Sequence, residues 1–196
     1  MSSKIINNDN TLIIFDWDDT LFPTKWFIKN NIDLNESYDA QKYGMYFKNL
    51  DNVLSKLLQK CYALGNVIII TNAMPIWIET SVNILPKTKN TIKNIKLISA
   101  RKNYQFSCKM TEWKKMAFEK ENNKKFINIL SIGDALYEYN ALINLHNKSN
   151  DVLLKSVKFV NDPSNDVLLD QLNVLNNSIN NICNTPKHFD LNFQTN

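Results

Sequence analysis

Apolar residues follow two alternating patterns along the chain. Short continuous runs rich in Ile, Val and Leu end in polar residues, which is typical of strands that are buried on both faces. Such runs predict strands at residues 11–16, 67–71, 95–99, 126–132 and 156–160. Parallel strands need a long crossover between them, so we expect helices in the intervening segments.

The intervening segments have apolar residues at helical spacing. The clearest predicted helix spans residues 47–64, and Gly65 follows it as a stop signal. Other helices are predicted at residues 75–85, 114–120, 137–145 and from about 164 towards 179. Strands that alternate with helices predict an α/β fold with three layers and a doubly wound, mostly parallel sheet.

The length and composition favour one domain. A chain of 196 residues with 44% hydrophobic content is long enough for one core and short for two. We expect the domain at residues 11–183, a flexible N-terminus at 1–10 and a loosely held tail at 184–196. No apolar run long enough for a membrane span and no signal-peptide pattern is present, so we expect no membrane contact. Three widely separated cysteines predict reduced thiols in a cytoplasmic protein.

Basic residues are concentrated in one part of the chain. From Lys87 to Lys125, twelve lysines and arginines stand against three glutamates, a net charge of +9 in a chain of net charge +4. Such a segment either binds an anionic partner or forms a solvated lysine-rich face, and the second is the commoner case.

Polar residues follow three of the predicted strands. Asp16 and Asp18 come at alternate positions after the first strand, and their mutual repulsion requires a nearby cation or one protonated carboxyl. Thr71 and Asn72 follow the second strand, and Asp134 follows the fourth. Carboxyl ends of parallel strands lie at one edge of the sheet, where ligands bind, so we expect these side chains to converge.

Four motifs together resemble those of the haloacid dehalogenase superfamily. They are Asp-x-Asp-Asp-Thr at residues 16–20, Thr71 after an apolar strand, a downstream lysine, and Gly-Asp-x-x-x-Glu at residues 133–138. They occur in the family's order, and the resemblance covers about residues 11–160. It implies a Mg²⁺-dependent phosphatase that acts on phosphate monoesters.

The resemblance also implies a role for each residue. Asp16 would be the nucleophile that forms an aspartyl-phosphate, and Asp18 the general acid and base. Thr71 and Asn72 would hold the phosphate oxygens. The Mg²⁺ ion would be bound by Asp16, the backbone carbonyl of Asp18 and Asp134.

The downstream lysine has three candidates. The resemblance favours Lys114 as the phosphate-binding, catalytic lysine because it lies at the start of the helix before the fourth strand. Lys109 and Lys115 are the alternatives. Glu138 stands where the family often has aspartate, and would either contact the metal from outside or orient Lys114.

Between the first two strands, residues 22–46 are too few for a separate cap domain, so we expect a capless enzyme with an open cleft. An open cleft favours a large phosphorylated substrate, such as a phosphoprotein or a nucleic-acid end. Trp17, Trp26 and Trp77 are expected to pack in the core or at its rim. The aromatic residues of the flap beside the cleft are Trp26, Phe27, Tyr38, Tyr43 and Tyr46.

Two other classes of function stay open. One is a phosphorylation-dependent switch similar to a receiver domain, in which the phosphorylated aspartate follows a later strand than the acid pair. The second is a catalytically silent binding module on the same fold. Here the candidate phosphorylated residue, Asp16, belongs to the same motif after the first strand as Asp18, which disfavours a receiver domain.

Overall fold

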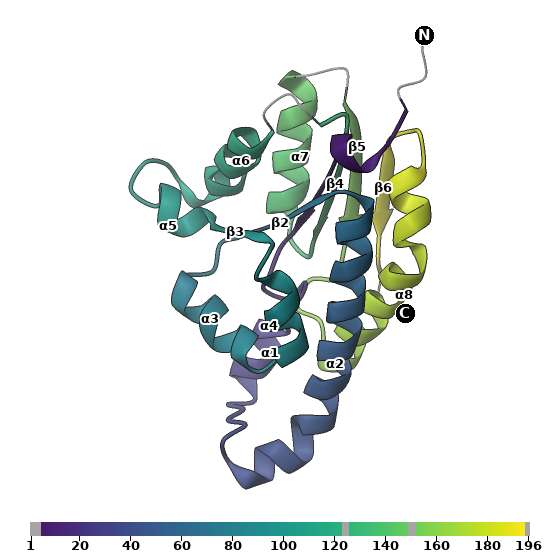
Figure 1. Ribbon diagram of the computed structural model, residues 1–196. Coiled ribbons are helices and arrows are strands. Elements are labelled where there is room, and N and C mark those ends of the chain that lie inside the picture. The colour runs from purple at the N-terminus through teal and green to yellow at the C-terminus, as the bar shows by residue number, and fades with distance from the viewer. Residues whose placement is uncertain (1–4, 123–125, 149–151, 195–196) are drawn as a thin grey trace.

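A computed structural model describes residues 5–122, 126–148 and 152–194 (Figure 1). Its strands form one six-stranded, all-parallel sheet in the order β3-β2-β1-β4-β5-β6. This confirms the predicted α/β class, and each predicted strand is present. The strands are β1 (Thr11–Phe15), β2 (Asn66–Thr71), β3 (Lys96–Ser99), β4 (Asn128–Gly133), β5 (Leu153–Lys158) and β6 (Phe189–Asn192).

Helices cover both faces of the sheet. The helices α2 and α8 pack against one face, and α6 and α7 pack against the other (Figure 1). In the described part of the chain, no helix is long and apolar enough to cross a membrane. The helices are η1 (Asn8–Asn10), α1 (Thr24–Lys29), α2 (Ser37–Leu64), α3 (Pro75–Asn83), α4 (Pro86–Ile92), α5 (Ala100–Tyr104), α6 (Met110–Glu121), α7 (Leu136–Lys148) and α8 (Asn165–Asn184).

Alternate residues of β1 belong to two separate hydrophobic cores. Ile13 and Phe15 join the core under α2 and α8, while Leu12 and Ile14 join the core under α6 and α7. Since both faces of this strand are buried, its sequence is a continuous apolar run, which is the pattern that predicted it.

The helical prediction was incomplete between β1 and β3. The helix predicted from residue 47 begins at Ser37, because Tyr43 and Tyr46 extend its apolar stripe towards the N-terminus. The last part of the predicted flap, residues 37–46, therefore forms the first turns of α2. The short helices α1 and α4 in this region were not predicted, and neither was α5, which follows β3. Pro86 both follows one helix and begins the next.

The C-terminal tail is more ordered than predicted. The strand β6 pairs in parallel with β5, with Lys155 opposite Phe189 and Lys158 opposite Asn192. Phe193 follows the strand, and its ring lies 5.2 Å from that of Phe159. Apolar residues at alternate positions from 189 to 193 were the signal for this strand.

Candidate active site

Three carboxylates meet at the carboxyl edge of the sheet. The backbone N–H of Asp16 donates to the carbonyl of Ile132 at 2.9 Å, which brings the residues after β1 and β4 side by side. Asp16, Asp134 and Glu138 are all buried, and one carboxylate oxygen of each lies within 4.8 Å of the others. The first two were predicted to converge here, and the third comes from the first turn of α7.

Lys114 supplies the positive charge inside this cluster. Its Nζ lies 2.8 Å from Oδ1 of Asp16 and also donates to Oε1 of Glu138. Burial alone lowers the pKa of Lys114, but the charges of Asp16 and Glu138 outweigh burial and keep the pKa above its ordinary value. Of the three candidate lysines, Lys109 is exposed and Lys115 pairs with Glu112, so only Lys114 contacts Asp16.

Gly133 makes room for Glu138. A Cβ atom at this position would lie 2.4 Å from Cγ and 2.6 Å from Cδ of Glu138. In the space that glycine leaves, Glu138 accepts a hydrogen bond from the backbone N–H of Ala135 at 3.2 Å as well as from Lys114. The Gly-Asp-x-x-x-Glu motif is therefore a packing unit that directs one carboxylate towards the lysine.

Asp134 is the carboxylate of the cluster that lacks a partner. Its side chain has no hydrogen bond or ion pair to any residue that the structure describes. Burial, together with the charges of Asp16 and Glu138, raises the pKa of Asp134 to about 8. Three buried carboxylates facing one lysine leave an excess of negative charge, and their oxygen atoms suit a hard cation.

Asp18 lies beside the cluster and is held through one oxygen. Its Oδ1 accepts hydrogen bonds from Oγ1 of Thr24 at 2.5 Å and from Nε1 of Trp77 at 2.9 Å. Burial raises the pKa of Asp18, and these two hydrogen bonds oppose the rise. Sequence reasoning did not identify Thr24, and expected Trp77 only as a packing residue of the core or its rim. The only signal for these two contacts was the position of the residues shortly after β1 and β2.

Asp19 shapes the turn that follows β1. It has a left-handed backbone conformation with φ of 53°, which aspartate tolerates better than most residues. Its Oδ1 accepts from the backbone N–H of Lys25 at 3.0 Å, and Nζ of Lys25 lies 3.4 Å from Oδ2. Asp19 therefore connects the end of β1 to the start of α1.

The loop after β2 carries the predicted phosphate-binding residues. Thr71 is fully buried, and its Oγ1 accepts from the backbone N–H of Ala73 at 3.0 Å. Ser99, at the end of β3, donates to the carbonyl of Ala73 at 2.7 Å. The Oδ1 atom of Asn72 is buried and has no hydrogen-bond partner among the described residues. This loop therefore offers polar atoms at the same edge of the sheet as Asp16.

The aromatic residues of the predicted flap pack against one another and against α3. The ring of Trp26 lies 5.4 Å from that of Tyr43 and 5.3 Å from that of Tyr46. Phe27 packs against Trp77, with 6.0 Å between ring centroids. Of the five flap residues, Tyr38 is 68% exposed. Trp17 is fully buried and donates to Ser81, so it belongs to the core as expected.

The structure describes most of the basic segment between Lys87 and Lys125 and shows ion pairs for some of its lysines. Lys124 and Lys125 lie outside the described residues. Lys96 forms an ion pair of 2.7 Å with Glu121, and Lys114 is buried in the cluster. The positive charge that the sequence concentrates here is therefore partly neutralised by acidic neighbours.

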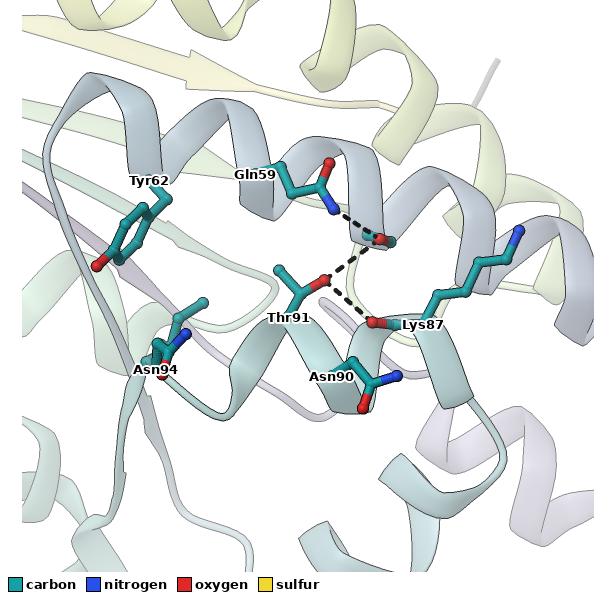
Figure 2. Close-up of a pocket in the computed structure, with 8 residues that line it drawn as sticks. Gln59, Tyr62, Lys87, Asn90, Thr91 and Asn94 are labelled. Atoms are coloured by element: carbon teal, nitrogen blue, oxygen red, sulfur yellow. Dashed lines mark hydrogen bonds between the residues drawn. The ribbon is translucent and has the colours of Figure 1, made fainter.

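A separate cavity of about 570 Å³ lies between α2 and α4 (Figure 2). Gln59 donates to Ser55, whose hydroxyl lies 3.3 Å from that of Thr91, and Thr91 donates to the carbonyl of Lys87. The residues that line this cavity include no carboxylate, histidine or cysteine. The cavity therefore offers none of the side chains that commonly carry out acid–base or nucleophilic chemistry, unlike the carboxyl edge of the sheet.

No family model, curated protein or solved structure matches this chain.

Proposed function

We propose that this chain is a Mg²⁺-dependent phosphomonoester hydrolase, a capless member of the haloacid dehalogenase superfamily, with Asp16 as its nucleophile. One observation carries the proposal. Asp16 pairs with Lys114 at 2.8 Å while Asp134 and Glu138 lie in the same buried cluster, at the edge where parallel sheets bind ligands. A folded core gains little from so many buried charges, whereas a phosphoryl-transfer site needs them.

In the proposed reaction, a carboxylate oxygen of Asp16 attacks phosphorus and the ester bond to the leaving oxygen breaks. Asp18 protonates the leaving oxygen and later removes a proton from the water that cleaves the aspartyl-phosphate. Lys114 and the hydroxyl of Thr71 hold phosphate oxygens, together with Asn72. The burial of Asp18, which raises its pKa, favours the protonated form that the first step requires.

The residues present fit a divalent cation. Asp16 and Asp134 would bind Mg²⁺ with the backbone carbonyl of Asp18, and the unpartnered carboxylate of Asp134 is the observation that supports this. When bound, the ion neutralises charge on the carboxylates and the phosphate. We assign Glu138 to the orientation of Lys114, because both of its oxygens already accept hydrogen bonds.

We further propose a large phosphorylated substrate, either a phosphoprotein or a nucleic-acid end. Between β1 and β2 the chain forms only α1, α2 and their loops, and α2 packs against the sheet, so no separate domain is present there to enclose a small substrate. The three cysteines are unpaired, which supports a reducing, cytoplasmic compartment.

Turnover of p-nitrophenyl phosphate tests the proposal. We expect hydrolysis that needs Mg²⁺, stops on addition of EDTA and is lost in Asp16→Asn. Asp170→Asn, an equivalent change at an exposed position of α8, is the control and should keep full activity. A phosphorylation-dependent switch would become phosphorylated without turnover, and a silent module would do neither.

A further inference from the structure

The carboxyl group of Asp18 is held asymmetrically. Both of its donors, Thr24 and Trp77, hydrogen-bond to Oδ1, and no described residue donates to Oδ2. The indole N–H of Trp77 also lies 3.2 Å from Oγ1 of Thr24. The three side chains therefore form a closed triangle that leaves one carboxyl oxygen outside it.

The chemistry of the donors decides which oxygen can carry a proton. An indole N–H is a donor only, so a proton on Oδ1 of Asp18 would face the N–H of Trp77. Thr24 accepts from the same N–H, which directs its own hydroxyl hydrogen towards Oδ1. The neutral carboxyl consequently keeps its hydrogen on Oδ2.

The triangle is held in place by aromatic packing. The ring of Trp77 lies 5.9 Å from that of Phe22 in an edge-on contact and 6.0 Å from that of Phe27. Thr24 begins α1, and Trp77 lies in the first turn of α3. The packing of α1 on α3 thus fixes both donors relative to the end of β1.

We propose that Thr24 and Trp77 are positioning residues that reserve Oδ2 of Asp18 for proton transfer, and that the site is built for alkyl phosphate esters. This inference rests on the proposed function. An alkoxide is a poor leaving group, so its departure requires a well-placed proton, whereas a p-nitrophenolate leaves readily without one.

The step is balanced with the residues named. A carboxylate oxygen of Asp16 bonds to phosphorus as the bond from phosphorus to the ester oxygen breaks, and the electron pair stays on that oxygen. The proton on Oδ2 of Asp18 moves to the same oxygen, which releases an alcohol and leaves Asp18 as a carboxylate. Oδ1 keeps its two hydrogen bonds throughout, so neither donor has to move.

Two conservative variants test the proposal. Trp77→Phe removes the N–H but keeps an aromatic ring, and Thr24→Val removes the hydroxyl at equal size. The readout is kcat with Mg²⁺ on glycerol 2-phosphate, an alkyl ester, and on p-nitrophenyl phosphate, an aryl ester. A hydrogen bond to a charged group is worth roughly 10–100-fold, so we expect each variant to lose about that much on the alkyl ester. The aryl ester should lose less than about threefold, since its transition state needs little proton transfer.

Trp26→Phe is the matched control. It makes the same change in the same aromatic region, but the indole N–H of Trp26 donates to no described residue, since only its backbone carbonyl is hydrogen-bonded, to Asn30. We expect it to leave the ratio of alkyl to aryl turnover unchanged. Equal losses on both esters in Trp77→Phe would mean that the indole only supports the fold, and would overturn the inference. Turnover of p-nitrophenyl phosphate without any turnover of glycerol 2-phosphate in the wild type would also overturn the inference. Absence of turnover on both esters would instead overturn the proposed function.

Discussion

Two lysines are buried among the described residues, and they lie in opposite electrostatic surroundings. Lys114 contacts two carboxylates at the carboxyl edge of the sheet. Lys155, in β5, has no carboxylate partner, and its Nζ donates to the backbone carbonyl of Cys183 at 2.6 Å. The pKa of Lys114 is therefore raised, while burial lowers the pKa of Lys155 to about 8.

The comparison separates a structural lysine from a candidate functional one. Lys155 shares its acceptor with Asn128, which donates to the same carbonyl at 3.0 Å, so it contributes to packing near the end of α8. Lys114 instead compensates a concentration of buried negative charge that contributes little to folding. A perturbed group surrounded by opposite charge at a ligand-binding edge is the better candidate for chemistry.

The largest contrast is expected in the stability of the two lysine-to-methionine variants. Lys114→Met leaves Asp16 and Glu138 without their cation, and breaking a buried pair from one side costs about 3–5 kcal/mol. Lys155→Met removes an unpaired buried charge and should be neutral or stabilising. Urea unfolding at pH 7 measures both. Equal destabilisation in the two variants would show that the distinction between them is wrong.

The pH dependence of stability sharpens the same comparison. Folded Lys155 loses its proton near pH 8, whereas a lysine in the unfolded chain does so near pH 10.4. Between these values the unfolded state binds more protons, so this group makes the free energy of unfolding increase with pH. The difference between the free energy of unfolding of the wild type and that of Lys155→Met should therefore rise by about 2–3 kcal/mol from pH 7 to pH 10. A difference that stays constant over this pH range would contradict the lowered pKa of Lys155.

A smaller effect is expected at Gly133, which makes room for the partner of Lys114. In Gly133→Ala, Glu138 has to move, and overpacking of this kind costs about 1–3 kcal/mol. Turnover of p-nitrophenyl phosphate should fall as well, because Glu138 then no longer orients Lys114. Gly44→Ala is the control, since no atom lies within 4 Å of the added Cβ. At this position inside α2 the change should stabilise by about 0.5–1 kcal/mol and leave turnover intact. If both variants keep wild-type turnover, Glu138 does not need the space at Gly133 to orient Lys114.

The strands and the residues after them could be predicted because the signal is local. Each buried strand is a continuous apolar run, and the polar residue after it must lie at the ligand-binding edge of a parallel sheet. Asp16, Thr71 and Asp134 were identified in this way, whereas Lys114 was favoured over Lys109 and Lys115 only by the family resemblance.

The contacts between helices could not be predicted in the same way. The bond from Trp77 to Asp18 joins residues 59 positions apart and depends on how α1 packs against α3. The pairing of Glu138 with Lys114 depends equally on how α6 packs against α7. Short helices such as α5 lack enough turns to show a period, so they too could be found only in the structure.

The most direct test of the central claim is detection of a phosphoryl group on Asp16. We suggest incubating Asp18→Asn with Mg²⁺ and p-nitrophenyl phosphate, quenching in acid, and analysing the peptides by mass spectrometry. The aspartyl-phosphate should accumulate on the peptide that contains Asp16, because the base that activates water is missing. It should be absent from the Asp16→Asn/Asp18→Asn double variant. Wild-type turnover by Asp16→Asn, or a phosphoryl group on a different residue, would contradict the account.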